Sequence, residues 1–313
     1  MEEKYGKRVT IREIQEFFKF ERLIGDDASL NRWTVVPDVN RPGFELCGFY
    51  KKSEPRRIIV IGNKESEFIK TMTPNEQRAR FPMLTDGLTP MIVITKNNAL
   101  PPILKEIADS QNFPIMRTEM ETYRLVTDII TYLDEKLAPE DTLSGTLLSI
   151  YGKGVLITGE SGMGKSETAL ELIRDKQVLI SDDRVDVAHI HNKIWGHSPA
   201  IIKGLLEIRG IGIIDVEKMF GASALGSRSQ IDLVINLVHY NSKIDINRIG
   251  DETLHYTKIL DVLIPTMVIP VGAGRNMAVL IESAVTHFIL QQDGFSSSKL
   301  IKDRFDQYVG KDV

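Results

Sequence analysis

Eight consecutive residues, GESGMGKS at positions 159–166, have the types and spacing that bind phosphate groups. They match the pattern GxxxxGK[ST] at each fixed position. Glycines let the backbone turn sharply and aim N–H groups at phosphate oxygens, Lys165 brings a mobile charge to the outer phosphates, and Ser166 can place its hydroxyl on a phosphate-bound Mg²⁺. The predicted nucleotide-binding residues are Gly159, Glu160, Ser161, Gly162, Met163, Gly164, Lys165 and Ser166.

Three elements must position this loop. Residues 154–158, GVLIT, form the apolar run of a buried strand, and residues 167–174, ETALELIR, have the spacing of an amphipathic helix. The helix begins at the loop, so its positive end adds to anion binding. Residues 145–150 and a turn at 151–154 predict a β-hairpin that leads into the loop. A chance match in a surface loop is the alternative, but the order of strand, loop and helix favours a phosphate site.

Two adjacent aspartates follow the next apolar strand, residues 177–181. Ligands of α/β sheets bind at the carboxyl ends of strands, so Asp182 and Asp183 are candidates for the second half of a nucleotide site. A kinase needs one carboxylate to hold Mg²⁺ and another to orient and deprotonate the acceptor hydroxyl, and an adjacent pair can divide those duties. The alternative is that both bind metal through water or cap a turn.

Further charged residues interrupt apolar stretches later in the chain. Glu207 and Arg209 lie within the run 205–214, LLEIRGIGII, where a buried charge needs a partner or a function. Arg248 and the loop 270–276, PVGAGRN, are further candidates for phosphate contact. Taken alone, each of these features is better explained by a structural role.

Three histidines raise the question of a metal site. His189 and His191 share a face if their segment is a strand, and His197 follows closely. Neither a third ligand at suitable spacing nor a supporting carboxylate is evident. We therefore favour a hairpin that turns at Asn192, with the histidines at exposed polar positions.

The first part of the chain has the pattern of an α/β fold. Residues 9–18 have helical spacing behind a threonine that can cap the first turn. Short β-branched runs at 57–62, 90–95 and 113–117 predict strands, with helical stretches between them. This alternation favours a largely parallel sheet.

A domain boundary is expected after this α/β region. A helix at 121–137 is broken by the segment 138–142, so we expect an N-terminal α/β domain at 1–138 and a C-terminal phosphate-loop domain at 139–313. We find no catalytic constellation in the first domain. Its segments 41–43 and 63–65 are candidates for functional loops, but the preference of these residue types for turns explains them equally well.

Composition excludes several classes of protein. The 313 residues carry a net charge of −4, with 42% hydrophobic and 26% charged residues, and lack the positive excess of a nucleic-acid binder. The single cysteine, Cys47, rules out an internal disulfide framework and fits a reducing compartment. No apolar run is long enough to span a bilayer, and residues 1–8 lack the apolar stretch of a signal peptide. We therefore expect a cytoplasmic protein with no membrane or nucleic-acid partner.

Seven segments over nearly the whole chain share motifs with one known family. They are DVNRPGFELCGF, KLAPEDT, GESGMGKSETALELI, ISDDRV, LLEIRGIGIIDVE, INRIG, and PVGAGRN followed by IESA. Together they resemble the bacterial HPr kinase/phosphorylase family. The resemblance implies a C-terminal domain with a phosphoenolpyruvate carboxykinase-type nucleotide site, which uses ATP to phosphorylate a serine of the phosphocarrier protein HPr in carbon catabolite regulation. It also implies a homohexamer, pyrophosphate as an alternative donor, and a reverse reaction in which phosphate attacks phosphoserine to release pyrophosphate.

Carried over position by position, the resemblance implies roles in binding phosphate and metal. Lys165 would stabilise the transferring charge, and Ser166 would ligate Mg²⁺. Glu207 would be a second Mg²⁺ ligand, and Asp182 would assist the placement of metal and phosphate.

The resemblance also implies which residues act on the reacting groups. Asp183 would be the base, and the same residue, once protonated, would be the acid in the reverse direction. Arg248 would neutralise charge on the phosphoryl group.

Two segments depart from the family pattern, at Ser144 in the first and at Gly272 and Ala273 in the second. The family usually carries a histidine and a glycine before the hairpin, where this chain has Ser144 and Gly145, and a basic residue and a proline in the later loop, where it has Gly272 and Ala273. Histidine could hydrogen-bond phosphate or tune the aspartate as pH changes, whereas serine has no titrating charge in that range. Two interpretations follow: Ser144 is tolerated in a bifunctional enzyme, or phosphorolysis is impaired.

Rival functions from the residues alone are a binding protein and a different kinase. A nucleotide-sensing protein could bind HPr or another partner without transferring phosphate, an alternative that Ser144 keeps open. A small-molecule kinase or carboxykinase-like protein is disfavoured, because the matches extend far outside the loop.

Overall fold

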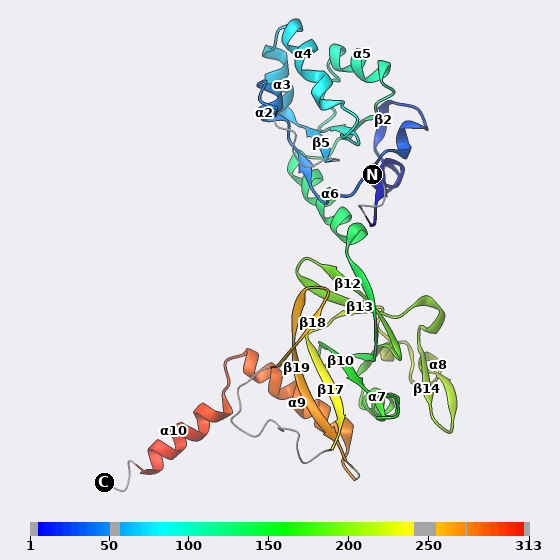
Figure 1. The fold of residues 1–313 in the computed structure, drawn as a ribbon, viewed down its shortest axis with the longest axis vertical. Helices are drawn as coiled ribbons and strands as arrows, with labels where there is room; N and C mark the ends of the chain where they lie inside the picture. The colour runs from blue at the N-terminus through cyan, green and yellow to red at the C-terminus, as the bar shows by residue number, and fades with distance from the viewer. Residues whose placement is uncertain (1–5, 51–56, 241–254, 273, 310–313) are drawn as a thin grey trace. The chain divides into compact units, whose positions relative to one another are not determined.

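The computed structural model describes residues 6–50, 57–240, 255–272 and 274–309. The chain divides into two compact units, Met1–Ala138 and Pro139–Val313, which are described separately (Figure 1).

The first unit alternates strands and helices. Its elements are β1 (Val9–Thr10), α1 (Ile11–Phe18), β2 (Glu21–Ile24), η2 (Ser29–Asn31), β3 (Trp33–Thr34), β4 (Val39–Asn40), α2 (Gly43–Leu46), β5 (Ile58–Ile61), α3 (Asn63–Thr71), α4 (Pro74–Leu84), β6 (Ile92–Ile94), α5 (Pro102–Ser110), β7 (Ile115–Arg117) and α6 (Thr122–Leu137). The three predicted strands appear as β5, β6 and β7, and the predicted long helix appears as α6.

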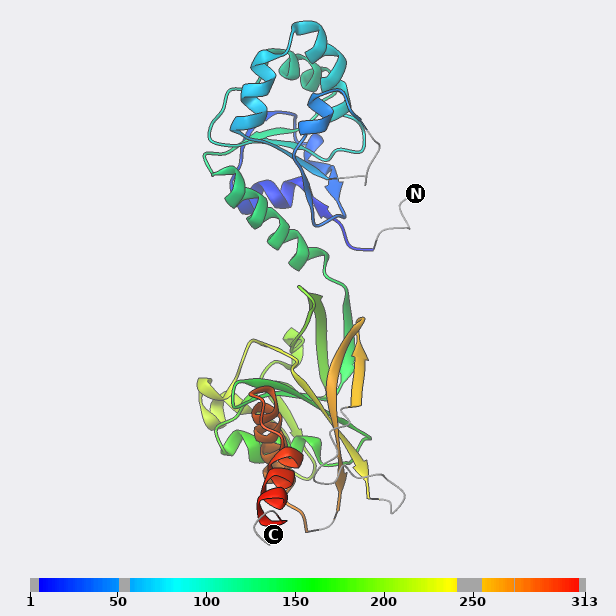
Figure 2. The ribbon, with the colours of Figure 1, turned by 90° about the vertical axis from the view of Figure 1, so that its left-hand side faces the viewer.

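A five-stranded sheet in the order β2-β7-β6-β5-β4 is the centre of this unit. Strands β4 to β7 are parallel and β2 is antiparallel to β7, so the prediction of a largely parallel sheet is confirmed. Alternate residues of β5 point to opposite faces: Ile58 and Val60 pack with α1 and α6, whereas Ile59 and Ile61 pack with α3, α4 and α5. Helices cover both faces of the sheet (Figure 2), which explains why the central strands β5 and β6 are apolar throughout.

Helix α1 begins at the threonine that the sequence indicates. Thr10 Oγ1 accepts from the Glu13 N–H at 3.3 Å, and the Glu13 carboxylate accepts from the Thr10 N–H at 2.8 Å. This reciprocal capping box satisfies two N–H groups that the helix itself leaves unpaired.

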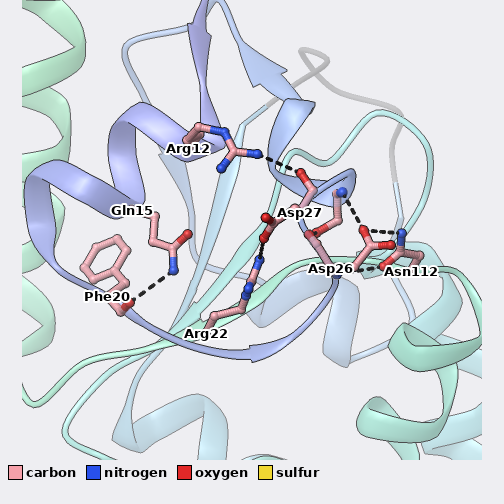
Figure 3. A network of polar contacts seen from close by, with 8 residues as sticks. Arg12, Gln15, Phe20, Arg22, Asp26, Asp27 and Asn112 are labelled. Carbon is pink, nitrogen blue, oxygen red and sulfur yellow. Dashed lines mark hydrogen bonds and ion pairs between the residues drawn. The ribbon is translucent and has the colours of Figure 1, made fainter.

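A network of polar contacts joins the turn after β2 to the segment before β7 (Figure 3). The Asn112 side chain donates to Asp26 Oδ1 at 2.7 Å, and its own oxygen accepts from the Asp26 N–H at 3.0 Å. Arg22 pairs with the Asp27 carboxylate at 2.6 Å, and Arg12 of α1 donates to Asp27 O at 2.9 Å. The network anchors the turn between β2 and η2 against the segment before β7.

The two loops noted in the sequence of this unit contact each other. Arg41 Nη2 donates to both carboxylate oxygens of Glu65, at 2.7 and 2.8 Å, and Glu65 also accepts from the Gly62 N–H at 2.9 Å. Glu65 is only 8% exposed. The ion pair joins the loop after β4 to the start of α3, which is a structural role.

The second unit combines two larger sheets with helices. Its elements are β8 (Glu140–Ser144), β9 (Thr146–Ile150), β10 (Lys153–Gly159), α7 (Lys165–Arg174), β11 (Val178–Ser181), β12 (Arg184–Ile190), β13 (Lys193–His197), η3 (Ala200–Ile202), β14 (Leu205–Ile208), β15 (Gly212–Asp215), α8 (Val216–Phe220), η4 (Ala222–Ala224), β16 (Arg228–Gln230), β17 (Leu233–His239), β18 (His255–Ile259), β19 (Val262–Val271), α9 (Met277–Gln292) and α10 (Ser297–Val309).

Six of the described strands of this unit form a central sheet in the order β11-β9-β10-β17-β19-β18. Strands β10, β17 and β19 are parallel, whereas β9 and β18 are antiparallel to their neighbours. One face packs against α7 and α9 (Figure 1). Leu172 of α7 and Ile281 of α9 are fully buried on that face. The other face packs against the sheet β16-β13-β12-β8 through side chains such as Leu156 and Val187. The protein is thus a mixed α/β fold with parallel and antiparallel pairing.

The hairpin predicted ahead of the loop is confirmed as β9 and β10, with Ile150 opposite Lys153.

Within the described residues, no helix combines the length and the apolar character that a bilayer crossing requires.

Candidate active site

The predicted phosphate loop connects β10 to α7. Gly159 ends β10 with a φ of 142°, and a Cβ atom at this position would lie 2.6 Å from Leu237 O of the neighbouring strand β17. Gly164, with a φ of 81°, immediately precedes α7. Both positions need glycine, because the first has no space for a side chain and the second has a left-handed backbone.

Two side chains of the loop have defined contacts. Met163 is 4% exposed and packs into the core beneath α7, which anchors the middle of the loop. Lys165 Nζ donates to Gly159 O at 2.9 Å and to Glu160 O at 3.0 Å, so its ammonium group lies across the loop. The lysine charge and the first N–H groups of α7 therefore meet at one place, which favours an anion.

The two aspartates after β11 have opposite environments. Asp182 is 5% exposed, whereas Asp183 is exposed to solvent. Asp183 has a φ of 61°, and this left-handed residue turns the chain between β11 and β12. The adjacent carboxylates are consequently directed to different sides of the segment.

The buried aspartate contacts the last residue of the loop. Ser166 Oγ donates to Asp182 Oδ2 at 2.9 Å, and Thr146 Oγ1 donates to Asp182 Oδ1 at 2.6 Å. Burial raises the pKa of Asp182 above its ordinary value, and the hydrogen bonds from Thr146 and Ser166 oppose that rise.

A cavity of about 170 Å³ brings most of the sequence candidates together. Its lining consists of loop residues and of charged side chains from other elements: Ser161, Gly162, Gly164, Lys165, Ser166, Glu167, Asp183, Glu207 and Arg209. A polar cavity with a lysine, an arginine and carboxylates at the start of a helix can bind a phosphorylated ligand and exchange a proton with it.

Glu207 and Arg209 reach this cavity from the β14–β15 hairpin. The expectation that they are buried is wrong: both are exposed, while Leu206 and Ile208 between and beside them are buried. Alternation along a strand explains this, because successive side chains point to opposite faces. A Cβ atom at Gly162 would lie 3.3 Å from Arg209 Nη1, so the guanidinium lies against the loop.

The positions that depart from the family pattern are only partly described. Ser144 is exposed at the end of β8, opposite Arg184 of β12, and the N–H of Gly145 donates to Asp183 O at 3.1 Å. Gly272 follows β19. Ala273 and the candidate Arg248 lie outside the described residues.

The three histidines belong to the β12–β13 hairpin, as the sequence predicts, but only His191 and His197 are exposed, whereas His189 is half-buried. His191 and Asn192 form its turn, with φ of 50° and 59°, and His189 lies opposite Ile194. Among the described residues, no group of three or more His, Cys, Asp or Glu side chains is arranged to hold a metal ion.

Three site residues are absent from the sequence-based set. Glu167 is identified there only as the first residue of the helix after the phosphate loop. Arg209 was noted only as a charge in an apolar run, although its position two residues after Glu207 puts both on one strand face. Thr146 is the first residue of an otherwise apolar strand, and its hydroxyl is the feature of the sequence that could have identified it as a site residue.

Comparisons with known proteins agree with the motifs. The family model described as "HPr Serine kinase C-terminal domain" matches residues 135–305, and the model "HPr Serine kinase N terminus" matches residues 9–133. The chain is 38% identical to a protein named "HPr kinase/phosphorylase" from Geobacillus thermodenitrificans (strain NG80-2), over 96% of this chain and 97% of the relative. It is 37% identical to a protein of the same name from Streptococcus equinus, over 97% of this chain and 98% of the relative.

A solved structure, titled "Structure of the Hpr(Ser) kinase/phosphatase from Coxiella burnetii", aligns with a TM-score of 0.47 and 35% identity. The alignment covers 51% of this chain and 98% of that chain. The two family models together span most of the sequence, and the relatives match at 37% identity and above over nearly their full length. This chain belongs to the HPr serine kinase family.

Proposed function

We propose that this protein transfers the γ-phosphoryl group of ATP to a serine of HPr, and that it also catalyses phosphorolysis of phosphoserine-HPr to pyrophosphate. The observation that carries the proposal is the cavity where Lys165 and Ser166 of the phosphate loop meet Asp183 and Glu207. Membership of the HPr serine kinase family supports HPr as the acceptor. The relatives from Geobacillus thermodenitrificans and Streptococcus equinus are named HPr kinase/phosphorylase, which supports both directions.

The loop from Gly159 to Ser166 is assigned to the nucleotide phosphates. We assign it to the phosphoenolpyruvate carboxykinase-type of phosphate-loop site because the family resemblance implies that type, and its position between β10 and α7 is the one that phosphate loops have. Lys165 already lies across the loop and can exchange its two carbonyl contacts for phosphate oxygens. Its charge then stabilises the transferring group. Arg248 is assigned a similar role by its motif, although it lies outside the described residues.

The oxygen donors beside the loop fit Mg²⁺. Mg²⁺ is usually held by one or two protein side chains together with substrate phosphates. Ser166 and the neighbouring Asp182 provide a hydroxyl and a carboxylate 2.9 Å apart, and Glu207 lines the same cavity as Ser166. When bound, Mg²⁺ would neutralise charge on the phosphates. We assign Ser166 and Glu207 as its ligands and Asp182 as support for Ser166.

Asp183 is assigned as the proton acceptor. It is an exposed carboxylate in the cavity, within reach of an acceptor serine that approaches from solvent. In the forward direction the serine oxygen attacks the γ-phosphorus, the bond to the β-phosphate oxygen breaks, ADP leaves, and the hydroxyl proton passes to Asp183. In the reverse direction an oxygen of inorganic phosphate attacks phosphoserine, the phosphorus–serine bond breaks, and protonated Asp183 returns the proton to the serine oxygen.

Labelled transfer tests the proposal directly. The purified protein is incubated with HPr, Mg²⁺ and ATP labelled in the γ-phosphate. We expect labelled phosphoserine on HPr. A stoichiometric complex with HPr that carries no label would instead identify a nucleotide-sensing binding protein and overturn the kinase assignment. The same assay with labelled pyrophosphate establishes whether pyrophosphate is an alternative donor.

The reverse direction has its own test, because Ser144 replaces the usual histidine. Serine-phosphorylated HPr is incubated with Mg²⁺ and inorganic phosphate, and pyrophosphate release is measured. Release at a rate that matches the kinase rate shows that Ser144 is tolerated. A kinase without release shows that phosphorolysis is impaired.

The proposed assembly is the homohexamer that the family resemblance implies. Sedimentation velocity of the purified protein tests it, and a monomer at the concentration of the kinase assay would contradict it.

A further inference from the structure

Thr146 is the first residue of β9 in the second unit, and none of the sequence motifs assigns it a role. Its side chain is fully buried, with 0% exposure, at the start of the apolar strand TLLSI. It lies opposite Ile157 of β10. Valine has the same branched shape and suits a buried strand equally well. The hydroxyl of Thr146 is therefore the part that needs an explanation.

This hydroxyl bonds to one oxygen of the Asp182 carboxylate. Thr146 Oγ1 donates to Asp182 Oδ1 at 2.6 Å, while Ser166 Oγ donates to Asp182 Oδ2 at 2.9 Å. Each carboxylate oxygen thus has its own hydroxyl donor. Two separate bonds fix the rotation of the carboxylate about its Cβ–Cγ bond, and in this rotation Oδ2 faces the serine of the phosphate loop.

The backbone holds Thr146 and Asp182 at this distance. The N–H of Gly145 donates to Asp183 O at 3.1 Å, and Leu147 pairs with Ser181 across β9 and β11. Thr146 lies between these two links. Its hydroxyl can leave Asp182 only by a change of rotamer, which the buried surroundings oppose.

Asp182 depends on such donors because it is largely removed from water. It is 5% exposed. A hydrogen bond to a charged group changes an equilibrium constant by roughly tenfold to a hundredfold. Loss of the Thr146 hydroxyl would leave one buried carboxylate oxygen without this donor.

Two other buried threonines show the ordinary alternative. Thr266 of β19 is 7% exposed, donates to Ile264 O at 3.1 Å and shares a hydrogen bond with Thr257 at 2.7 Å. Thr95 is 0% exposed and donates to a main-chain carbonyl, Ile61 O, at 3.3 Å. Burial of a threonine hydroxyl therefore does not by itself require a carboxylate partner.

We propose that Thr146 is a positioning residue: its hydroxyl orients the Asp182 carboxylate so that Oδ2 stays on Ser166, and thereby supports Mg²⁺-dependent nucleotide binding. The inference rests on the proposed function, which assigns Ser166 to Mg²⁺ and the phosphate loop to the nucleotide. Thr146 acts through Asp182 and contacts neither ligand.

Two substitutions separate the hydroxyl from the shape of the side chain. Thr146→Val keeps the volume and removes the donor, whereas Thr146→Ser keeps the donor. The full-length proteins are titrated with a fluorescent ATP analogue, once with excess Mg²⁺ and once with EDTA. For T146V we expect the affinity in Mg²⁺ to fall about tenfold and the affinity in EDTA to change by less than about twofold. T146S should keep the Mg²⁺ response of the wild type.

The matched control is Thr266→Val, which removes a buried hydroxyl from the same sheet. Thermal unfolding should report similar losses for T266V and T146V, but T266V should keep the full Mg²⁺ response. An unchanged Mg²⁺ response in T146V, equal losses with and without Mg²⁺, or a T146S protein as weak as T146V would each overturn the inference. If the wild-type protein itself binds nucleotide equally well with and without Mg²⁺, the proposed metal site fails as well. Failure of the proposed metal site is therefore seen in the wild type, whereas failure of the role of Thr146 alone is seen only in the variants.

Discussion

Replacing Asp183 by asparagine tests the assignment of the base with little disturbance of the fold. Asp183 has a φ of 61°, a left-handed conformation that asparagine tolerates as well as aspartate. Its side chain is exposed, and the hydrogen bond that its carbonyl accepts from the Gly145 N–H does not involve the carboxylate. We therefore expect Asp183→Asn to change the free energy of unfolding by less than about 0.5 kcal/mol.

The expected effect on transfer is much larger. A positioned general base typically contributes about 10²-fold to 10⁴-fold, which corresponds to roughly 2.7–5.4 kcal/mol in the activation free energy. Asparagine cannot accept the serine proton, so kcat should fall by that factor. Nucleotide binding should persist within about threefold, because Lys165, Ser166 and Asp182 are untouched.

Single-turnover transfer from labelled ATP to HPr measures the first quantity, and equilibrium binding of nucleotide measures the second. Asp186→Asn on β12 is the matched control, since Asp186 makes its contacts with Thr142 and Arg184 and lines a different cavity. The control should transfer at nearly the wild-type rate. Full transfer by Asp183→Asn would remove Asp183 as the base, and an equal loss in Asp186→Asn would show that the effect is not specific to the site.

Three further substitutions have defined outcomes. Gly159→Ala puts a methyl group 2.6 Å from Leu237 O, so urea denaturation should show a loss of about 2 kcal/mol, and wild-type stability would contradict the packing. Burial raises the pKa of Asp182, so protonation of this carboxyl stabilises the folded state. That stabilisation is fully present below the ordinary aspartate pKa and is lost as pH rises through the raised pKa. Asp182→Asn should therefore be at least as stable as wild type at pH 8, and a lower Tm of the variant at that pH would contradict this. Burial raises the pKa of Glu65, but hydrogen bonds from Arg41 and the backbone outweigh burial and lower the pKa. The charged carboxylate therefore stabilises the folded state above the ordinary glutamate pKa, and this stabilisation is lost as pH falls through the lowered pKa. Glu65→Gln should cost about 1–3 kcal/mol at pH 7 in urea denaturation, and a cost that does not shrink towards pH 3 would refute this account.

The first unit was largely predictable because its signals are local. Apolar β-branched runs marked β5, β6 and β7, and a threonine ahead of a stretch with helical spacing marked the start of α1. The pairing of Arg41 with Glu65 was not predictable, although both loops were noted. The two residues lie 24 positions apart, and the contact depends on the order of the strands between which their loops run.

In the second unit the motif was predictable and its surroundings were not. Spacing alone identified Lys165 and Ser166, but β9 lies between β10 and β11, so the strand that leads to Asp182 is not adjacent to the strand that carries the loop. The sequence contains no local signal for this order. Since β9 occupies the position between them, its first residue, Thr146, lies against the aspartate. That contact spans 36 residues of the chain and follows from the order and the register of these strands.

The different surroundings of Asp182 and Asp183 depend on one backbone conformation. Here β11 ends at Ser181, Asp183 takes a left-handed φ of 61°, and β12 begins at Arg184, so one carboxylate is buried against Ser166 and the other faces the cavity. A buried carboxylate held by two hydroxyls is suited to fixed support, whereas an exposed one in the cavity is suited to exchange a proton with an acceptor. The proposed division of roles in the pair therefore follows from the turn between β11 and β12, and a substitution at Asp183 that excludes the left-handed conformation should disturb both carboxylates together.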